Sequence, residues 1–216
     1  MPEPFHPVAN SILRLSLLGG VGLSAFVLWA GYLAVRSPYE MMQEVPREQP
    51  LPFSHEHHAG GLGIDCRYCH VAVEDGPFAD IPPTAVCLNC HSEMWAAAPA
   101  LAPVRQSYAT NLSIQWTKVY GLPQYVYFDH SIHIHKGIGC SDCHGRVDQM
   151  QLTWQAPPLT MAWCLECHRN PELHVRPLAD VFKMDYRRPP EQAVLGARLV
   201  KEYQIQRLTS CTVCHR

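Results

Sequence analysis

All ten cysteines of the 216-residue chain fall into one pattern, C-x-x-C followed directly by histidine. The pattern occurs five times, as CRYCH, CLNCH, CSDCH, CLECH and CTVCH. Two thiols at this spacing form thioethers to a porphyrin, and the next histidine supplies one axial nitrogen to the iron. The sequence therefore predicts five covalently bound c-type haems. The attaching cysteines are Cys66, Cys69, Cys87, Cys90, Cys140, Cys143, Cys164, Cys167, Cys211 and Cys214, and the proximal histidines are His70, His91, His144, His168 and His215.

Three other uses of paired cysteines fit this pattern less well. Zinc ribbons with four cysteine ligands take C-x-x-C pairs in twos, and five is an odd number. Thioredoxin-type redox pairs need no following histidine. Disulfides are common in exported chains, but they give no reason for a histidine after every pair.

A low-spin electron carrier needs a second axial ligand on each iron, and the histidines outside the motifs are the first candidates. His6 precedes the apolar N-terminal segment and is set aside. An internal repeat sorts the rest, because PFSHEHHAGGLGIDCRYCH and YFDHSIHIHKGIGCSDCH share F-x-H-x-x-H ahead of a haem motif. Residues at i and i+3 of a helical turn point the same way, so one short segment can serve two irons. The shared histidines are His55, His58, His130 and His133, whereas His57 and His135 lie outside the pattern and are predicted bystanders.

The elements that must position these ligands are short. Proline makes up 19 of the 216 residues, and clear helical or alternating periodicity is hard to find after residue 40. We therefore predict a mostly irregular, loop-rich fold with short α-helices, organised around five haems. The haem domain is expected over residues 37–216, with one module at about 50–95 and a second at about 125–216.

The first 36 residues form a different kind of segment. The 21 residues between Arg14 and Arg36 carry no charge, and a helix of that length spans the roughly 30 Å of a bilayer core. A signal peptide is the alternative, but its apolar region is usually only about 7–15 residues long. We predict a single transmembrane helix at about 15–35. Because c-type haems in bacteria are attached outside the cytoplasmic membrane, the haem domain is expected in the periplasm, anchored to the inner membrane by one pass.

Charge excludes one class of partner. The formal net charge of −2 argues against nucleic acid, which requires a clustered basic surface. Thirteen of the 17 basic residues are arginine, whose planar fork suits carboxylates such as haem propionates. The arginines considered for this role, with a solvated surface position as the equal alternative, are Arg67, Arg146, Arg169, Arg187 and Arg188.

The F-x-H-x-x-H…C-x-x-C-H arrangement resembles the small multihaem cytochromes c3 and c7. This resemblance implies that the first histidine ligates the haem of the next motif and the second ligates the following haem. It thus implies the pairs His55 with His70, His58 with His91, His130 with His144, and His133 with His168. The position of the last distal ligand in the c7 pattern falls on Met161, which implies a His/Met haem at His215. Met150, Met184 and His174 remain alternatives for that ligand.

The whole chain is similar to the pentahaem cytochrome subunit of alternative complex III, a bacterial quinol:electron-acceptor oxidoreductase. The similarity rests on the single N-terminal span together with PFSHEHH, GIDCRYCH, IPPTAVCLNCH, VYFDHSIHIHKGIGCSDCHGRVDQM, LTMAWCLECHRNPE and RPLADVF. It implies a non-catalytic electron relay between integral membrane quinol-oxidising and iron–sulfur subunits and an acceptor. That acceptor would be a monohaem cytochrome c or a terminal oxidase.

Two alternatives come from other functional classes. Single-span quinol dehydrogenases of the NapC/NrfH type begin their haem motifs close to the membrane helix, whereas here 30 residues, 36–65, intervene before Cys66. A multihaem reductase needs an open iron with acid–base groups beside it. The chain has enough distal ligands to fill every iron, and its sequence shows no such catalytic constellation.

Overall fold

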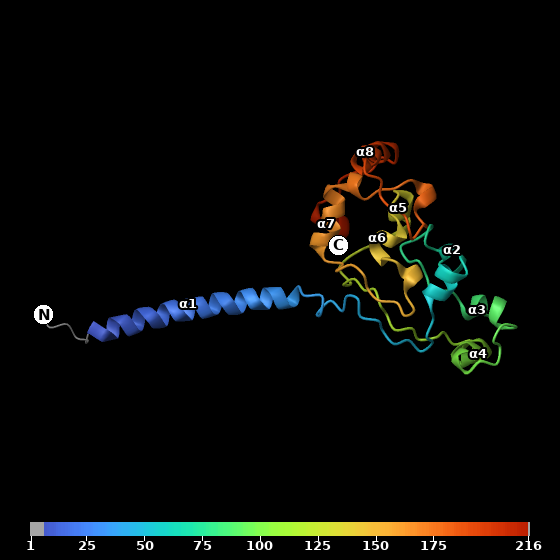
Figure 1. Cartoon of the computed structure of the whole chain (residues 1–216), viewed down its shortest axis with the longest axis horizontal. Helices are drawn as coiled ribbons and strands as arrows, with labels where there is room; N and C mark the ends of the chain where they lie inside the picture. The colour runs from blue at the N-terminus through green and yellow to red at the C-terminus, as the bar shows by residue number, and fades with distance from the viewer. Residues whose placement is uncertain (1–6, 216) are drawn as a thin grey trace. The chain divides into compact units, whose positions relative to one another are not determined.

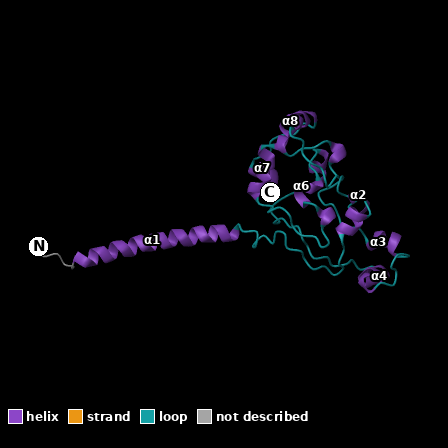
Figure 2. Cartoon of the chain, in the orientation of Figure 1, coloured by secondary structure: helices purple, strands orange, loops and turns teal. Residues whose placement is uncertain are grey.

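The computed structural model describes residues 7–215 and divides the chain into two compact units, the first ending at Gln43 and the second beginning at Glu44. The first unit is dominated by one long helix, α1 (Pro7–Val35), and the second is built from short helices joined by loops (Figures 1 and 2).

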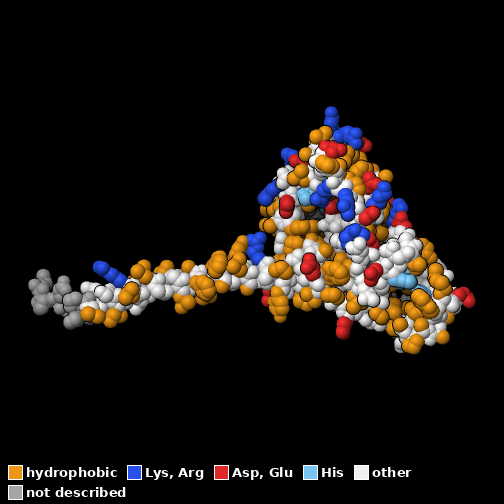
Figure 3. Space-filling model, in the orientation of Figure 1, with side chains coloured by type: hydrophobic (Ala, Val, Ile, Leu, Met, Phe, Trp, Pro, Cys, Tyr) orange, Lys and Arg blue, Asp and Glu red, His pale blue; other side chains and the backbone are white. Residues whose placement is uncertain are grey.

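Helix α1 begins well before residue 15, where the uncharged run starts. Proline suits the first position of a helix because its missing N–H needs no partner there and its φ is already helical. The large hydrophobic side chains of α1 from Val8 to Val35 are exposed, and Figure 3 shows hydrophobic groups along it. By length and composition, Val8–Val35 is a candidate membrane span, although a signal sequence near the N-terminus meets the same criteria.

The second unit follows the prediction of short helices in a loop-rich chain. Among residues 44–215 no strand forms, and Val126 and His215 make an isolated antiparallel bridge. The α-helices are α2 (Cys66–Cys69), α3 (Thr84–His91), α4 (Ala102–Thr110), α5 (His130–His135), α6 (Cys140–His144), α7 (Met161–Arg169), α8 (Gln192–Glu202) and α9 (Cys211–Cys214). The shorter turns are the π-helix η1 (Glu56–Gly61) and the 3-10 helices η2 (Pro99–Leu101), η3 (Val147–Gln149), η4 (Pro171–Leu173) and η5 (Leu178–Asp180).

Every C-x-x-C pair lies on a helix, which brings its two thiols to one face because residues three apart are neighbours on a helical surface. Side chains before two of these helices fix where they start. The Asp65 carboxylate accepts from the Arg67 N–H at α2, and the Thr160 hydroxyl accepts from the Trp163 N–H at α7. Local capping therefore positions the haem-attaching thiols.

The apolar core of the second unit is small. Val73, Ile134 and Val181 form its buried cluster, with Ala79 and Phe182 packed against it. Other buried hydrophobic side chains are scattered along the chain. Domains of this length ordinarily bury a larger share of their apolar surface. The small core is consistent with porphyrin rings filling much of the interior.

Candidate haem-binding site

In the first module, two histidines of the F-x-H-x-x-H segment each lie opposite the histidine of a haem motif. The His55 and His70 rings face each other with centroids 6.5 Å apart and planes at 10°, and the His58 and His91 rings lie 6.2 Å apart with planes at 66°. Phe53 sets the upstream rings, because it packs edge-on against His55 at 4.9 Å and stacks on His58 at 4.4 Å.

The second module repeats this geometry. The centroids of His130 and His144 are 6.3 Å apart with planes at 12°, and those of His133 and His168 are 6.2 Å apart with planes at 68°. Phe128 packs edge-on against His130 at 4.8 Å and stacks on His133 at 4.5 Å. The repeat seen in the sequence is thus a repeat of ring positions and ring angles.

The separation within the four pairs, 6.2–6.5 Å between centroids, fits an iron between two imidazoles. A metal–nitrogen bond is about 2.0 Å, and a ring nitrogen lies about 1.1 Å from its centroid, so two rings on one metal are separated by roughly 6.2 Å. Two nitrogens are what a porphyrin iron lacks, since the macrocycle supplies the other four. Among residues 7–215, no group of three or more His, Cys, Asp or Glu side chains is placed to hold a metal ion by itself.

The tautomers of these histidines also suit binding to an iron. Where Nδ1 meets a backbone carbonyl it must donate, which leaves the Nε2 lone pair free for a metal. The carbonyl partners and Nδ1···O distances are Ser54 for His58 (2.8 Å), Asp80 for His70 (2.6 Å), Met94 for His91 (3.0 Å), Pro77 for His130 (2.7 Å), Asp129 for His133 (2.7 Å) and Tyr125 for His215 (3.2 Å). Nδ1 of His55 lies 3.0 Å from the Thr153 hydroxyl.

Burial keeps several of these rings neutral, as a metal ligand must be. Burial, with neighbouring histidines adding to the effect, lowers the pKa of His55 to about 4 and that of His144 to about 4. Burial also lowers the pKa of His133.

The histidines outside the four pairs and the haem motifs make other contacts. In His135, Nε2 lies 2.9 Å from the Glu74 carbonyl. In the paired rings, Nε2 is instead the nitrogen left free for a metal. His57 packs edge-on against His58 at 5.3 Å and lies 5.9 Å from Trp95. Burial lowers the pKa of His174, which lies near Arg188. His6 is outside the described residues.

The fifth motif is tied to the start of the second module. Tyr127 N–H donates to the Cys214 carbonyl at 2.8 Å, and the Tyr125 ring lies 5.8 Å from that of His215. Met161 begins α7 and is 67% exposed, one turn before Cys164, whose thiol lies near that of Cys214. Met150 and Met184 are both buried. The structure thus places Met161 on the helix that approaches the fifth motif.

Neighbouring thiols show how the five motifs follow one another in space. The Cys66 and Cys140 thiols lie close enough to shift each other's pKa, which brings CRYCH next to CSDCH. Burial raises the pKa of three other thiols, and each is raised further by a thiol of a neighbouring motif: Cys69 by Cys87, Cys143 by Cys167 and Cys164, and Cys164 by Cys214. The spatial order is therefore CLNCH, CRYCH, CSDCH, CLECH and CTVCH. The first two motifs are exchanged relative to their order in the chain.

Three of the arginines considered for haem propionates are paired with carboxylates of the chain itself. The ion pairs are Arg67 with Asp65 at 2.9 Å, Arg146 with Asp148 at 2.7 Å, and Arg188 with Asp142 at 2.7 Å. Arg169 and Arg187 are exposed, and neither makes an ion pair within the described part of the chain.

Two aromatic side chains beside proximal histidines escaped the sequence analysis. The Tyr120 ring packs 4.5 Å from that of His144, and its hydroxyl donates to the Trp154 carbonyl at 3.0 Å. The Trp95 ring stacks 6.1 Å from that of His91. Neither residue belongs to a haem motif or to the F-x-H-x-x-H repeat, and only the folded chain brings them to the ligands.

Comparison with known proteins agrees with this geometry. Residues 126–216 match the family described as "Cytochrome c7 and related cytochrome c", so this part of the chain is similar to cytochrome c7-type multihaem domains. The chain is also homologous to the "Menaquinone reductase, multiheme cytochrome c subunit" of Nitratidesulfovibrio vulgaris, with 36% identity over 99 residues. That match covers 45% of this chain and 46% of the relative, so the chain spans about half of the relative's length.

Proposed function

We propose that the chain is a membrane-anchored pentahaem cytochrome c that relays electrons within a quinol-linked respiratory complex. The observation that carries this proposal is the set of four histidine ring pairs, 6.2–6.5 Å between centroids, each of which joins the histidine of a haem-attachment motif to a second histidine. When bound, the haems supply one-electron carriers. The chain contributes their spacing, their axial ligands and the exclusion of water from the buried rings.

The ligand assignment follows from the ring pairs. His55 and His70 hold one iron, His58 and His91 a second, His130 and His144 a third, and His133 and His168 a fourth. His215 is the proximal ligand of the fifth, and Met161 is its proposed distal partner. With both axial positions taken, these sites transfer electrons and do not bind a substrate, which separates the chain from multihaem reductases.

The partners and the direction of electron flow are the finer part of the proposal. The similarity to alternative complex III supports a flow from membrane quinol through an iron–sulfur subunit to a periplasmic cytochrome c or a terminal oxidase. The homologous subunit is named for menaquinone reduction, which supports the opposite flow as the second candidate. In both, α1 is the anchor in the inner membrane and the haem domain lies in the periplasm.

Purification of the full chain from its native membrane in mild detergent tests this function. We expect five haems per chain by pyridine haemochrome and mass, together with co-purifying polytopic and iron–sulfur subunits. Reduction of the haems by added quinol would identify the first direction, and oxidation of pre-reduced haems by menaquinone the second. A chain that purifies alone with fewer than five haems would contradict the proposal.

Two histidines on α5 provide a matched test of the ligand assignment. We expect His133→Ala to convert one iron in five to a high-spin form, because His133 alone faces His168 with Nε2 free. His135→Ala should leave all five low-spin, because its Nε2 is already at the Glu74 carbonyl. Optical and EPR spectra of the oxidised proteins measure both outcomes. A high-spin signal in the His135 variant, with none in the His133 variant, would reverse the assignment.

A further inference from the structure

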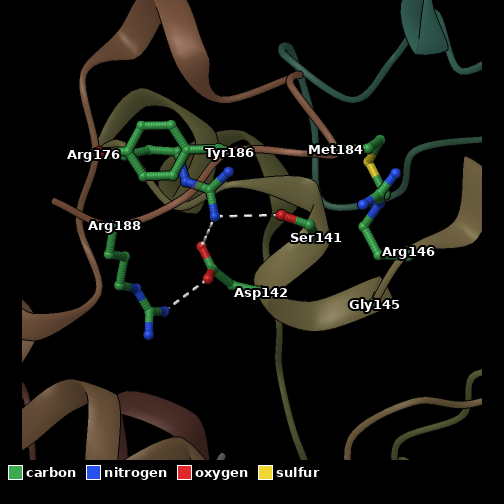
Figure 4. Close-up of a pocket in the computed structure, with 8 residues that line it drawn as sticks. All are labelled: Ser141, Asp142, Gly145, Arg146, Arg176, Met184, Tyr186 and Arg188. Atoms are coloured by element: carbon green, nitrogen blue, oxygen red, sulfur yellow. Dashed lines mark hydrogen bonds and ion pairs between the residues drawn. The ribbon is translucent and has the colours of Figure 1, made fainter.

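A partly buried ion cluster lies between the third and fourth haem motifs. Asp142, one of the two residues between Cys140 and Cys143, accepts from two arginines: Arg176 Nη2 lies 2.6 Å from Oδ2, and Arg188 Nη2 lies 2.7 Å from Oδ1 (Figure 4). Oδ2 also accepts from the Gly139 N–H at 3.1 Å. Two guanidinium groups against one carboxylate leave the cluster with one net positive charge.

Packing fixes Arg176 in this position. Its side chain is only 3% exposed, and its Cζ lies 4.4 Å from the centre of the Tyr186 ring. On the other side, a Cβ at Gly139 would overlap the guanidinium, so only glycine leaves room for it. Nη1 donates to the Lys183 carbonyl at 3.3 Å, and Nη2 donates to the Ser141 hydroxyl at 3.2 Å. Arg176 therefore cannot swing into solvent.

The cluster lies directly against the third haem motif. Ser141 and Asp142 are the two residues between Cys140 and Cys143, and the Arg176 guanidinium donates to both side chains. Arg188, which donates to the other oxygen of Asp142, also lies near Cys167 of the fourth motif. Each arginine thus faces one motif, and the shared carboxylate lies near both.

Other charges around the cluster change this balance little. The three residues of the cluster line a pocket that Arg146 also lines (Figure 4). The charge of Arg146 is neutralised by Asp148, which lies 2.7 Å away. Glu166, which lies near Cys167, is exposed to solvent, where its charge is screened. The Arg176 and Asp142 side chains are only 3% and 14% exposed, so their charges are screened much less than those at the surface.

We propose that Arg176, Asp142 and Arg188 form a potential-setting cluster, which raises the reduction potentials of the haems attached at Cys140/Cys143 and Cys164/Cys167. A nearby positive charge stabilises the form that carries the extra electron. The proposal rests on the proposed function, because it requires haems at these two motifs. The three residues tune the step between neighbouring carriers and do not ligate iron.

Arg188 offers the cleanest test because its side chain is 43% exposed and its loss leaves Asp142 paired with Arg176. In the full-length detergent-purified protein, we expect Arg188→Gln to lower one of the five potentials in a spectroelectrochemical titration. Arg188→Lys, which keeps the charge, should restore most of the shift. Asp142→Asn should move potentials in the opposite direction, upward.

Arg187 is the matched control, since Arg187→Gln removes the same formal charge one residue away from an exposed side chain without an ion pair. Its effect should be smaller and should fall more steeply with added salt than that of Arg188→Gln, because Arg188 is paired with the largely buried Asp142. Equal shifts in the two glutamine variants, or five unchanged potentials in Arg188→Gln, would overturn the cluster proposal. Haem content separates the two proposals, because fewer than five haems in the unmodified protein contradicts the proposed function itself.

Discussion

Replacing Cys140 and Cys143 together by alanine is expected to remove one haem and to divide the relay into two halves. The CSDCH motif is the middle member of the spatial series, with CRYCH and CLNCH on one side and CLECH and CTVCH on the other. Whichever end receives electrons, only the two haems on that side should be reduced rapidly by the natural donor. Stopped-flow absorbance of the purified complex, read against total haem reduced by dithionite, measures that number.

The control for this experiment is the corresponding double alanine variant of Cys211 and Cys214. This change also leaves four haems, but it removes an end of the series, so the donor should reduce either all four rapidly or none. Rapid reduction of all four haems in the Cys140/Cys143 variant would show that electrons bypass the third motif, and the linear order would then be wrong.

Changing Met161 to histidine is expected to lower a single reduction potential by a large amount. Methionine in place of histidine as an axial ligand raises the potential, and axial ligands control a range of about 0.8 V in haem proteins. Met161 is 67% exposed, so the substitution should not disturb packing. A redox titration of the variant should show four unchanged haems and one shifted downward.

The alternative ligands supply the controls for Met161. Met150→Leu and Met184→Leu conserve volume in buried positions and should leave the fifth haem low-spin and its potential unchanged. The same result is expected for His174→Gln. Five unchanged potentials in Met161→His, with a new high-spin iron in one of these variants, would move the assignment to that residue.

Much of this site can be predicted from sequence because the chemistry is local. Haem attachment needs five consecutive residues, and the F-x-H-x-x-H repeat places His130 and His133 one turn apart on a helix, with Phe128 just before it. The pairing of those histidines with particular motifs came from family resemblance and stays a prediction, which the ring separations of 6.2–6.5 Å support.

Other features depend on contacts between distant segments. The carbonyls that orient His70, His130 and His215 belong to Asp80, Pro77 and Tyr125, and every residue has a carbonyl, so no side-chain pattern marks them. The exchange of the first two motifs in space is likewise invisible in chain order. The contact of Asp142 with Arg176 and Arg188 spans 34 and 46 residues.

The start of α1 shows a smaller limit of the same kind. A charge-free run predicts the apolar part of a helix but not its first turn, which here extends back to Pro7 through residues that include polar side chains. Backbone hydrogen bonding continues wherever no residue opposes it, so the helix is longer than its uncharged stretch.

The closeness of the Cys66 and Cys140 thiols has a consequence for biogenesis. The same closeness would bring the two attached haems near each other. Before haem is attached, it leaves two reactive thiols from different modules side by side. In an oxidising compartment such thiols tend to join, and a cross-link between modules would block both attachment sites. Under the proposed function, maturation in the periplasm would therefore have to keep these cysteines reduced until haem is attached, which would make the supply of reductant as necessary to assembly as the supply of haem.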